Sequence, residues 1–161
     1  MSATAAELQL PSPPPELKRL DFLVGTWQMT GRTEDTPMGP GAEMSATETF
    51  EWMEGGFFLL HRWEGGFEVG GRKIADVGYE FFDYDVEKGR FRSRYFNSFG
   101  AWDDTDSTYK GHFHGDSLVM TGPARMTRTL TADGTITCDS DRPEDDGGWV
   151  PFMRATLTRI P

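Results

Sequence analysis

The chain is 161 residues long and carries a formal net charge of −10 at pH 7. This length suits one domain with a single core, and an aromatic content of 13% lets a small number of side chains fill it. An acidic surface repels phosphate backbones and anionic lipids, so we expect neither nucleic acid nor membrane partners.

The N-terminus and the cysteine content bear on the compartment. The first ten residues, MSATAAELQL, lack the basic start and the apolar stretch of a secretory signal. Cys138 is the single cysteine, which excludes a disulfide within the chain. The sequence contains no apolar run long enough to span a membrane. These features predict a cytoplasmic protein.

Prolines separate a tail from the folded part. Residues 1–15 end in PSPPP, a sequence that favours extended polyproline conformations. We predict a flexible tail over 1–15 and one domain over 16–161. At the start of that domain, ELKRLDFLVG predicts a short helix with Leu17, Leu20 and Leu23 on its apolar face.

After Gly25 the hydrophobic period drops to two residues, which is typical of half-buried strands. Ten segments show this alternation: 26–34, 42–53, 57–64, 72–85, 90–99, 106–114, 116–122, 125–132, 135–140 and 149–160. Hairpin-length turns join them, and GGFEVGG at 65–71 is predicted as one of these loops. Closing such a sheet removes its unpaired edges. We therefore predict an all-β fold: a closed antiparallel up-and-down barrel of about ten strands, with the helix capping one end.

The junction between helix and first strand, LDFLVGTW at 20–27, resembles the opening of a calycin. Lipocalins and fatty-acid-binding proteins share a short helix there, followed by Gly-x-Trp at the start of the first strand. The resemblance implies that Trp27 closes the barrel base and packs against an arginine of the last strand. Arg159 is the first candidate for that arginine and Arg154 the second. A cation–π contact of this kind contributes ~0.5–2 kcal/mol.

Further motifs are similar to those of a family of uncharacterised bacterial lipocalin-like barrels, a domain of unknown function. The motifs are LDFLVGTW, GGFFLLHRW, GYEFFDYDVEKGRF, FNSFG and GGWVPFMRATLTR. The resemblance covers the chain from about residue 17 to its end. It implies the barrel fold but no particular activity.

One strand shows which phase faces inward. In RFRSRYFNSF, the side chains of Arg90, Arg92 and Arg94 share one phase and face water. The opposite phase, followed around the barrel, predicts the inner surface. It comprises Met29, Glu48, Phe50, Trp52, His61, Trp63, Tyr95, Asn97, Tyr109, Met126, Arg128 and Cys138. Arg128 points inward in this register, whereas a slip of one residue would turn it outward.

An apolar interior with a few convergent polar groups is typical of a small-molecule site. We predict that the barrel binds a small hydrophobic or amphipathic ligand, such as a fatty or aromatic acid. The predicted ligand-binding residues are Trp52, His61, Trp63, Tyr95, Asn97, Tyr109 and Arg128. The tryptophans would supply apolar surface, and Arg128 with the tyrosines would hold a carboxylate or phenolate. The plainer alternative is that these polar side chains satisfy one another in a filled core.

Two other functions stay open at this point. Barrels that resemble lipocalins include isomerases, cyclases and dehydratases, and His61 with Tyr95 or Glu48 would be the acid–base pair here. An assembly module is the other alternative. The exposed residues of its homodimer face would be Phe57, Phe58 or Phe82. We expect binding rather than catalysis.

We predict neither a metal ion nor a cofactor. His112 and His114 share the outer phase of a strand, so we expect exposed side chains rather than ligands. The acidic stretches 103–106 and 144–148 lack the spacing of a calcium loop. The nitrobindins, which are related barrels, bind haem through a histidine late in the chain, and no histidine follows His114 here. Cys138 is expected to pack as a small hydrophobe.

Overall fold

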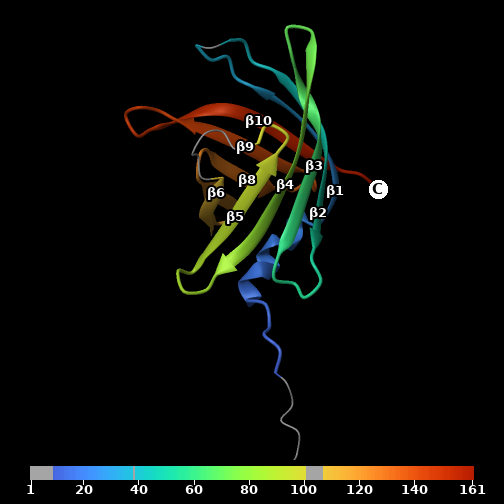
Figure 1. Ribbon diagram of the computed structural model, residues 1–161, viewed down its shortest axis with the longest axis vertical. Helices are drawn as coiled ribbons and strands as arrows, with labels where there is room; N and C mark the ends of the chain where they lie inside the picture. Colours follow the sequence, from blue (N-terminus) through green and yellow to red (C-terminus); the bar gives the residue numbers. More distant parts are fainter. Residues whose placement is uncertain (1–8, 38, 101–106) are drawn as a thin grey trace, which may run out of the picture.

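The computed structural model describes residues 9–37, 39–100 and 107–161. A 3₁₀ helix, η1 (Pro15–Leu23), precedes ten strands. The strands are β1 (Gly25–Thr33), β2 (Glu43–Trp52), β3 (Leu59–Val69), β4 (Arg72–Asp85), β5 (Arg90–Asn97), β6 (Thr108–His114), β7 (Ser117–Thr121), β8 (Arg125–Leu130), β9 (Ile136–Pro143) and β10 (Trp149–Arg159). Consecutive strands pair antiparallel, and β10 pairs with β1 to close a barrel (Figure 1). The predicted fold class is confirmed.

The hairpin between β3 and β4 is tighter than the sequence predicts. We expected a loop over 65–71, but β3 runs through most of this stretch, and Gly70 and Gly71 make the turn. Both have positive φ, 56° and 76°, which suits a two-residue hairpin and costs glycine no steric strain. Gly65 fits within β3 because β2 approaches closely: a Cβ there would lie 2.1 Å from the Ser45 carbonyl oxygen.

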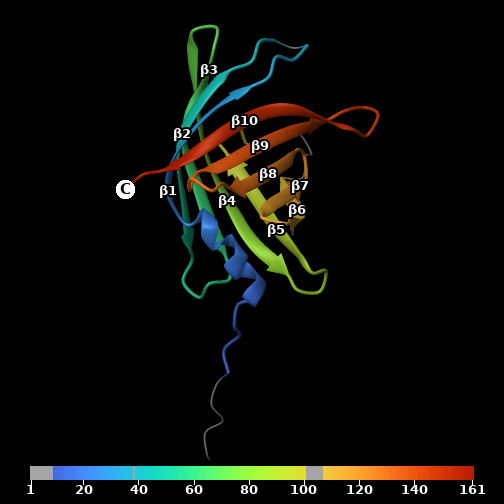
Figure 2. The same ribbon diagram turned by 180° about the vertical axis from the view of Figure 1, so that it is seen from behind.

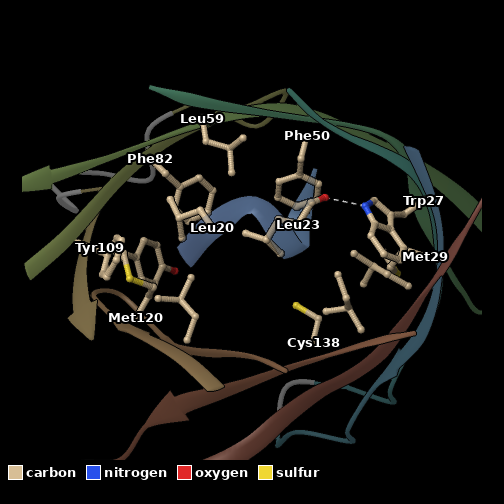
Figure 3. Close-up of a cluster of buried hydrophobic side chains, with 14 of the residues drawn as sticks. Leu20, Leu23, Trp27, Met29, Phe50, Leu59, Phe82, Tyr109, Met120 and Cys138 are labelled. Atoms are coloured by element: carbon tan, nitrogen blue, oxygen red, sulfur yellow. Dashed lines mark hydrogen bonds between the residues drawn. The ribbon is translucent and has the colours of Figure 1, made fainter. Parts of the chain in front are cut away.

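η1 closes one end of the barrel with an apolar face. Leu17, Leu20 and Leu23 are buried, and their spacing of three residues matches the period of a 3₁₀ helix. The helix crosses one opening of the barrel (Figure 2), and Leu20 and Leu23 lie at the centre of a ring of buried side chains (Figure 3). The predicted short helix is therefore present in 3₁₀ form. Residues 9–14 contain no helix or strand, and the predicted flexibility of the tail stays a prediction.

Trp27 lies at the junction of η1 and β1 and is fully buried. Its Nε1 donates a hydrogen bond of 2.7 Å to the Leu23 carbonyl (Figure 3). Arg159 is its neighbour across the sheet, with the guanidinium carbon 4.1 Å from the ring centroid. The same guanidinium donates to the Val24 carbonyl at 2.9 Å. Arg159, rather than Arg154, thus occupies the position that the calycin resemblance implies.

Inward-facing side chains differ between the two halves of the barrel. In the closed half, next to η1, most of them are buried: Phe50, Leu59, Phe82, Phe91, Leu118, Ile136 and Leu157. In the open half, away from η1, the larger ones are partly exposed: Met44, Trp63, Phe67, Tyr95, Asn97, Met126 and Met153. Between the halves lie four buried charged or titratable side chains, which we call the charged layer: Glu48, His61, Glu80 and Arg128.

Candidate functional site

The charged layer crosses the barrel interior. His61 on β3 lies between two glutamates: Nδ1 is 3.1 Å from Glu80 Oε2, and Nε2 is 3.1 Å from Glu48 Oε2. Arg128 reaches across from β8 and donates from Nη2 to the same Glu80 oxygen at 3.1 Å. Ser93 on β5 donates to Glu80 Oε1 at 2.6 Å. Glu80 therefore joins three partners within the layer.

Strand register explains these positions. Glu80 is opposite His61 in the pair of β3 and β4. Glu48 lies two residues from Phe50, which is opposite His61 in the pair of β2 and β3. Residues two apart on a strand share a face, so Glu48 and Phe50 lie on the same face of the sheet as His61 and Glu80. This face points into the barrel. Phe50 stacks on the imidazole, with ring centroids 3.9 Å apart and planes 5° from parallel. This stack and the two carboxylates fix the plane of the ring.

The contacts shift the pKa values of His61 and Glu80. Burial alone would lower the pKa of His61, but hydrogen bonds to Glu48 and Glu80, and their charges, raise it above its ordinary value of 6.5. Burial alone would raise the pKa of Glu80, but the charge of Arg128 and the hydrogen bond with His61 lower it to about 2. Glu80 is therefore ionised near neutral pH, and the imidazolium form of His61 is favoured.

Arg128 keeps donors that no described residue uses. Its side chain is 5% exposed, and its guanidinium carbon lies 5.4 Å from the centroid of the Phe82 ring. Nε and Nη1 are buried without a hydrogen-bond partner in the described part of the chain. Buried donors normally have a partner. These two nitrogens therefore lack the acceptors that buried donors normally have within the described part of the chain.

Aromatic side chains lie next to the charged layer. The ring centroid of Trp63 is 5.2 Å from that of His61. Trp63 also covers Gly78, where a Cβ would lie 2.0 Å from the indole, so this packing requires glycine. The rings of Tyr95 and Tyr109 have centroids 5.8 Å apart. Burial raises the pKa of both tyrosines above the ordinary value of 10, so both hydroxyls stay protonated near neutral pH.

The structure separates Trp52 from the other predicted ligand-binding residues. Its Nε1 donates to Asp21 Oδ1 at 2.9 Å, and its ring lines a groove of about 330 Å³ beside η1 and the prolines at 13–15. Trp52 is the last residue of β2, beyond Phe50, and so lies at the closed end. This corrects the predicted grouping, because alternation gives the face of a strand but not the height along the barrel axis.

Asn97 and Cys138 are two other residues that the sequence predicts on the inner face. Asn97 lies at the end of β5, where its Oδ1 accepts a hydrogen bond from the Phe99 N–H at 3.1 Å. Cys138 is buried opposite Arg128 on β9. Burial raises the pKa of its thiol to about 11, so Cys138 is a protonated packing residue.

A groove of about 500 Å³ lies at the rim of β2, β3 and β4, and Glu43, Phe67 and Glu68 are among its lining residues. None of the predicted ligand-binding residues lines it. Asp76 faces inward on β4, between this rim and Glu80. Its Oδ1 is buried without a hydrogen-bond partner among the described residues. Burial raises its pKa, against the effect of a hydrogen bond from Trp63. Burial therefore disfavours the ionised form of Asp76.

Glu80 and Ser93 are site residues that the sequence pattern did not lead us to predict. Glu80 alternates with Gly78 and Phe82 on the inner face of β4, and Ser93 follows Phe91 on that of β5. Glu80 lies within the motif GYEFFDYDVEKGRF, but the resemblance implied the barrel fold and no role for this residue, and Ser93 lies outside the quoted motifs. The available signal is the alternation itself, continued along the whole of β4, which has 14 residues.

The geometry also bears on the two alternative functions. The structure brings the predicted acid–base pair of His61 and Glu48 into contact at 3.1 Å, and the other ring nitrogen of His61 faces Glu80. The expectation that Phe82 is exposed is wrong, because its side chain is 0% exposed and packs in the closed half. Phe57 is partly exposed and Phe58 is 42% exposed. A homodimer through these two residues stays a prediction.

His112 and His114 are exposed on β6. In the described part of the chain, no group of three or more His, Cys, Asp or Glu side chains is arranged to hold a metal ion. The acidic stretch 103–106 lies outside the described residues, and 144–148 forms the turn between β9 and β10. None of the described helices has the length and apolar character needed to cross a membrane. The cytoplasmic location stays a prediction.

Comparison with known proteins places the chain in a family. Residues 12–159 match the profile of a family described as "Protein of unknown function (DUF1579)". The chain belongs to the DUF1579 family. This confirms the resemblance to an uncharacterised barrel family. No curated protein matches the chain significantly.

Two solved structures share the barrel of this DUF1579 chain. Rv2717c from M. tuberculosis has a TM-score of 0.62 and 16% sequence identity, over 93% of this chain and 100% of that chain. The S-type phycobiliprotein lyase CPES from Guillardia theta has a TM-score of 0.53 and 11% identity, over 89% of this chain and 92% of that chain. At these identities the likeness shows the fold alone.

Proposed function

We propose that this DUF1579 protein binds a small hydrophobic or amphipathic molecule in the open half of its barrel, with the polar group of that molecule against Arg128. The observation that carries the proposal is the pair of buried guanidinium nitrogens, Nε and Nη1, that have no partner among the described residues. Burying donors of a charged group without hydrogen bonds costs free energy. An acceptor supplied by a ligand offsets this cost.

The apolar part of the ligand would contact the inner side chains of the open half. Trp63, Tyr95 and Met126 are partly exposed there, and covering such surface contributes about 25 cal/mol per Å². The closed half is filled by buried side chains, so the ligand would lie on the open side of the charged layer. The phycobiliprotein lyase of the same fold supports this proposal only as a fold-level analogy.

A fluorescence titration with the neutral probe N-phenyl-1-naphthylamine tests the proposal. We expect saturable binding. The titration detects it because the fluorescence of the probe increases in apolar surroundings. Trp63→Ala removes part of the inner wall and should weaken binding about fivefold or more, which corresponds to about 1 kcal/mol.

Trp149→Ala is the matched control. Trp149 is another partly buried tryptophan, whose ring centroid lies 5.3 Å from the guanidinium carbon of Arg125, on the outer face. Its loss should leave the affinity unchanged, with circular dichroism showing that both variants are folded. Absence of saturable binding, or equal weakening in the two variants, would contradict the proposal.

A further inference from the structure

We infer that the barrel interior selects its ligand by charge: it favours neutral molecules with a carbonyl or amide oxygen over carboxylates of the same shape. This inference rests on the proposed function and names the ligand class of that site. It differs from the fatty or aromatic acid that the sequence suggests, because the sequence pattern did not reveal the carboxylate of Glu80.

The charged layer holds no surplus positive charge. Arg128 contributes one positive charge, whereas Glu48 and Glu80, as carboxylates, contribute two negative charges. His61 adds one positive charge when it is protonated and none otherwise. The sum is therefore zero or −1. A ligand carboxylate would bring a further negative charge into a buried site, where an uncompensated charge is costly.

A neutral acceptor meets the needs of Arg128 without this cost. Glu80 already balances the guanidinium through the hydrogen bond of 3.1 Å to Nη2. What Nε and Nη1 lack is a hydrogen-bond acceptor, not an anion. A carbonyl oxygen offers two lone pairs, and hydrogen bonds from a charged donor are among the stronger ones. The geometry therefore favours a ketone, amide or ester oxygen at this position.

The rim of the barrel adds to the selectivity. Asp76 faces inward between the rim and Glu80. Glu43 and Glu68 line the rim groove with Lys73, and Arg32 pairs with Glu43. The whole chain carries a net charge of −10. An anionic ligand would be repelled on its way to Arg128, whereas a neutral ligand would not.

Two matched pairs of probes test the inference by calorimetry: octanamide against octanoate, and 2-naphthamide against 2-naphthoate. Within each pair the shape is nearly constant and only the charge changes at about pH 7.5, where carboxylic acids are ionised. We expect the amide to bind about tenfold tighter or more in at least one pair.

Glu80→Gln then removes one negative charge from the charged layer. We expect it to raise the affinity for the carboxylate about tenfold relative to the amide. Glu48→Gln provides the same change through the other carboxylate, should Glu80→Gln fail to fold. The matched control is Asp141→Asn, which removes one negative charge from the outer face, where Asp141 pairs with Arg125 and Arg154. It should leave the ratio of the two affinities unchanged.

The outcomes separate the inference from the proposed function. Equal affinities, or tighter binding of the carboxylate, would overturn the inference and leave the proposed function intact. An equal shift in Glu80→Gln and Asp141→Asn would also overturn it, because net charge rather than the charged layer would then set the preference. Binding of N-phenyl-1-naphthylamine without binding of any of the four compounds would overturn the inference alone. If none of the five probes binds, the proposed function itself fails.

Discussion

The closed and open halves of the barrel are made by the same ten strands, yet their inner faces differ in kind. In the closed half, η1 and Trp27 complete an apolar core, in which the inner side chains of Phe50, Leu59 and Phe82 are buried. In the open half, the same alternation produces partly exposed aromatic side chains. The change occurs at the charged layer. We therefore expect stability to depend mainly on the closed half and binding on the open half.

The largest effect on stability should come from the closed half. Trp27→Ala removes a fully buried indole and its hydrogen bond to Leu23, so we expect a loss of about 3–5 kcal/mol in the free energy of unfolding. Urea denaturation measures it. Phe96→Ala is the control, since this side chain is 51% exposed on the outer face and should change stability by less than about 0.5 kcal/mol. A loss below about 1 kcal/mol for Trp27→Ala would contradict the packed closed half.

Breaking the charged layer should come next. Arg128→Met leaves Glu80 buried without its guanidinium partner and should cost about 3 kcal/mol. Adding Glu80→Gln removes the orphaned charge, so the double variant should be more stable than Arg128→Met alone. Arg125→Met is the control, because its ion pair with Asp141 is partly solvated and should contribute less than about 1 kcal/mol. Equal losses for the two arginines would show that the layer is not a buried network.

The pH dependence of stability tests the contribution of His61. Its pKa is raised in the folded state, so its contribution is complete below 6.5 and is lost as the pH rises through the folded value. The pKa of Glu80 is lowered from 4.5 to about 2, so its contribution is complete above 4.5 and is lost toward pH 2. Together the two groups predict that their contribution to stability is constant between pH 4.5 and pH 6.5.

His61→Gln isolates the alkaline part of this profile. We expect the stability difference between wild type and His61→Gln to be largest near the acidic side of neutrality and to shrink as the pH rises. Urea denaturation of both proteins across the pH range measures this difference, and titrating groups that His61 does not contact cancel in it. A difference that stays constant with pH would mean that Glu48 and Glu80 do not hold a proton on His61.

The smallest effect should come from the outer edge of the closed end. Arg159→Ala removes the guanidinium above Trp27, a contact worth about 1 kcal/mol at an exposed position. Arg32→Ala is its control, since its ion pair with Glu43 is exposed on both sides and should matter by less than about 0.5 kcal/mol. An unchanged unfolding midpoint for Arg159→Ala would show that Trp27 needs no cation to close the barrel.

The alternation of apolar residues predicted which side chains of a strand point inward, but it did not predict their position along the barrel axis. It placed His61, Trp63 and Arg128 on the inner face, because the strand period is two and each turn has a hairpin length. It did not show that Trp52 lies at the closed end, since height along the axis depends on the register between strands. Nor did it reveal that Glu80 neutralises Arg128, because β4 and β8 are far apart in the chain and meet only across the lumen.

A crystal structure of the protein with octanamide would show whether Arg128 binds a neutral oxygen inside the barrel. We expect the amide oxygen within about 2.7–3.2 Å of Nε or Nη1 of Arg128, with the alkyl chain against Trp63 in the open half. Octanamide bound instead in the rim groove of β2, β3 and β4, or beside Trp52 at the closed end, with Arg128 unchanged, would contradict this expectation.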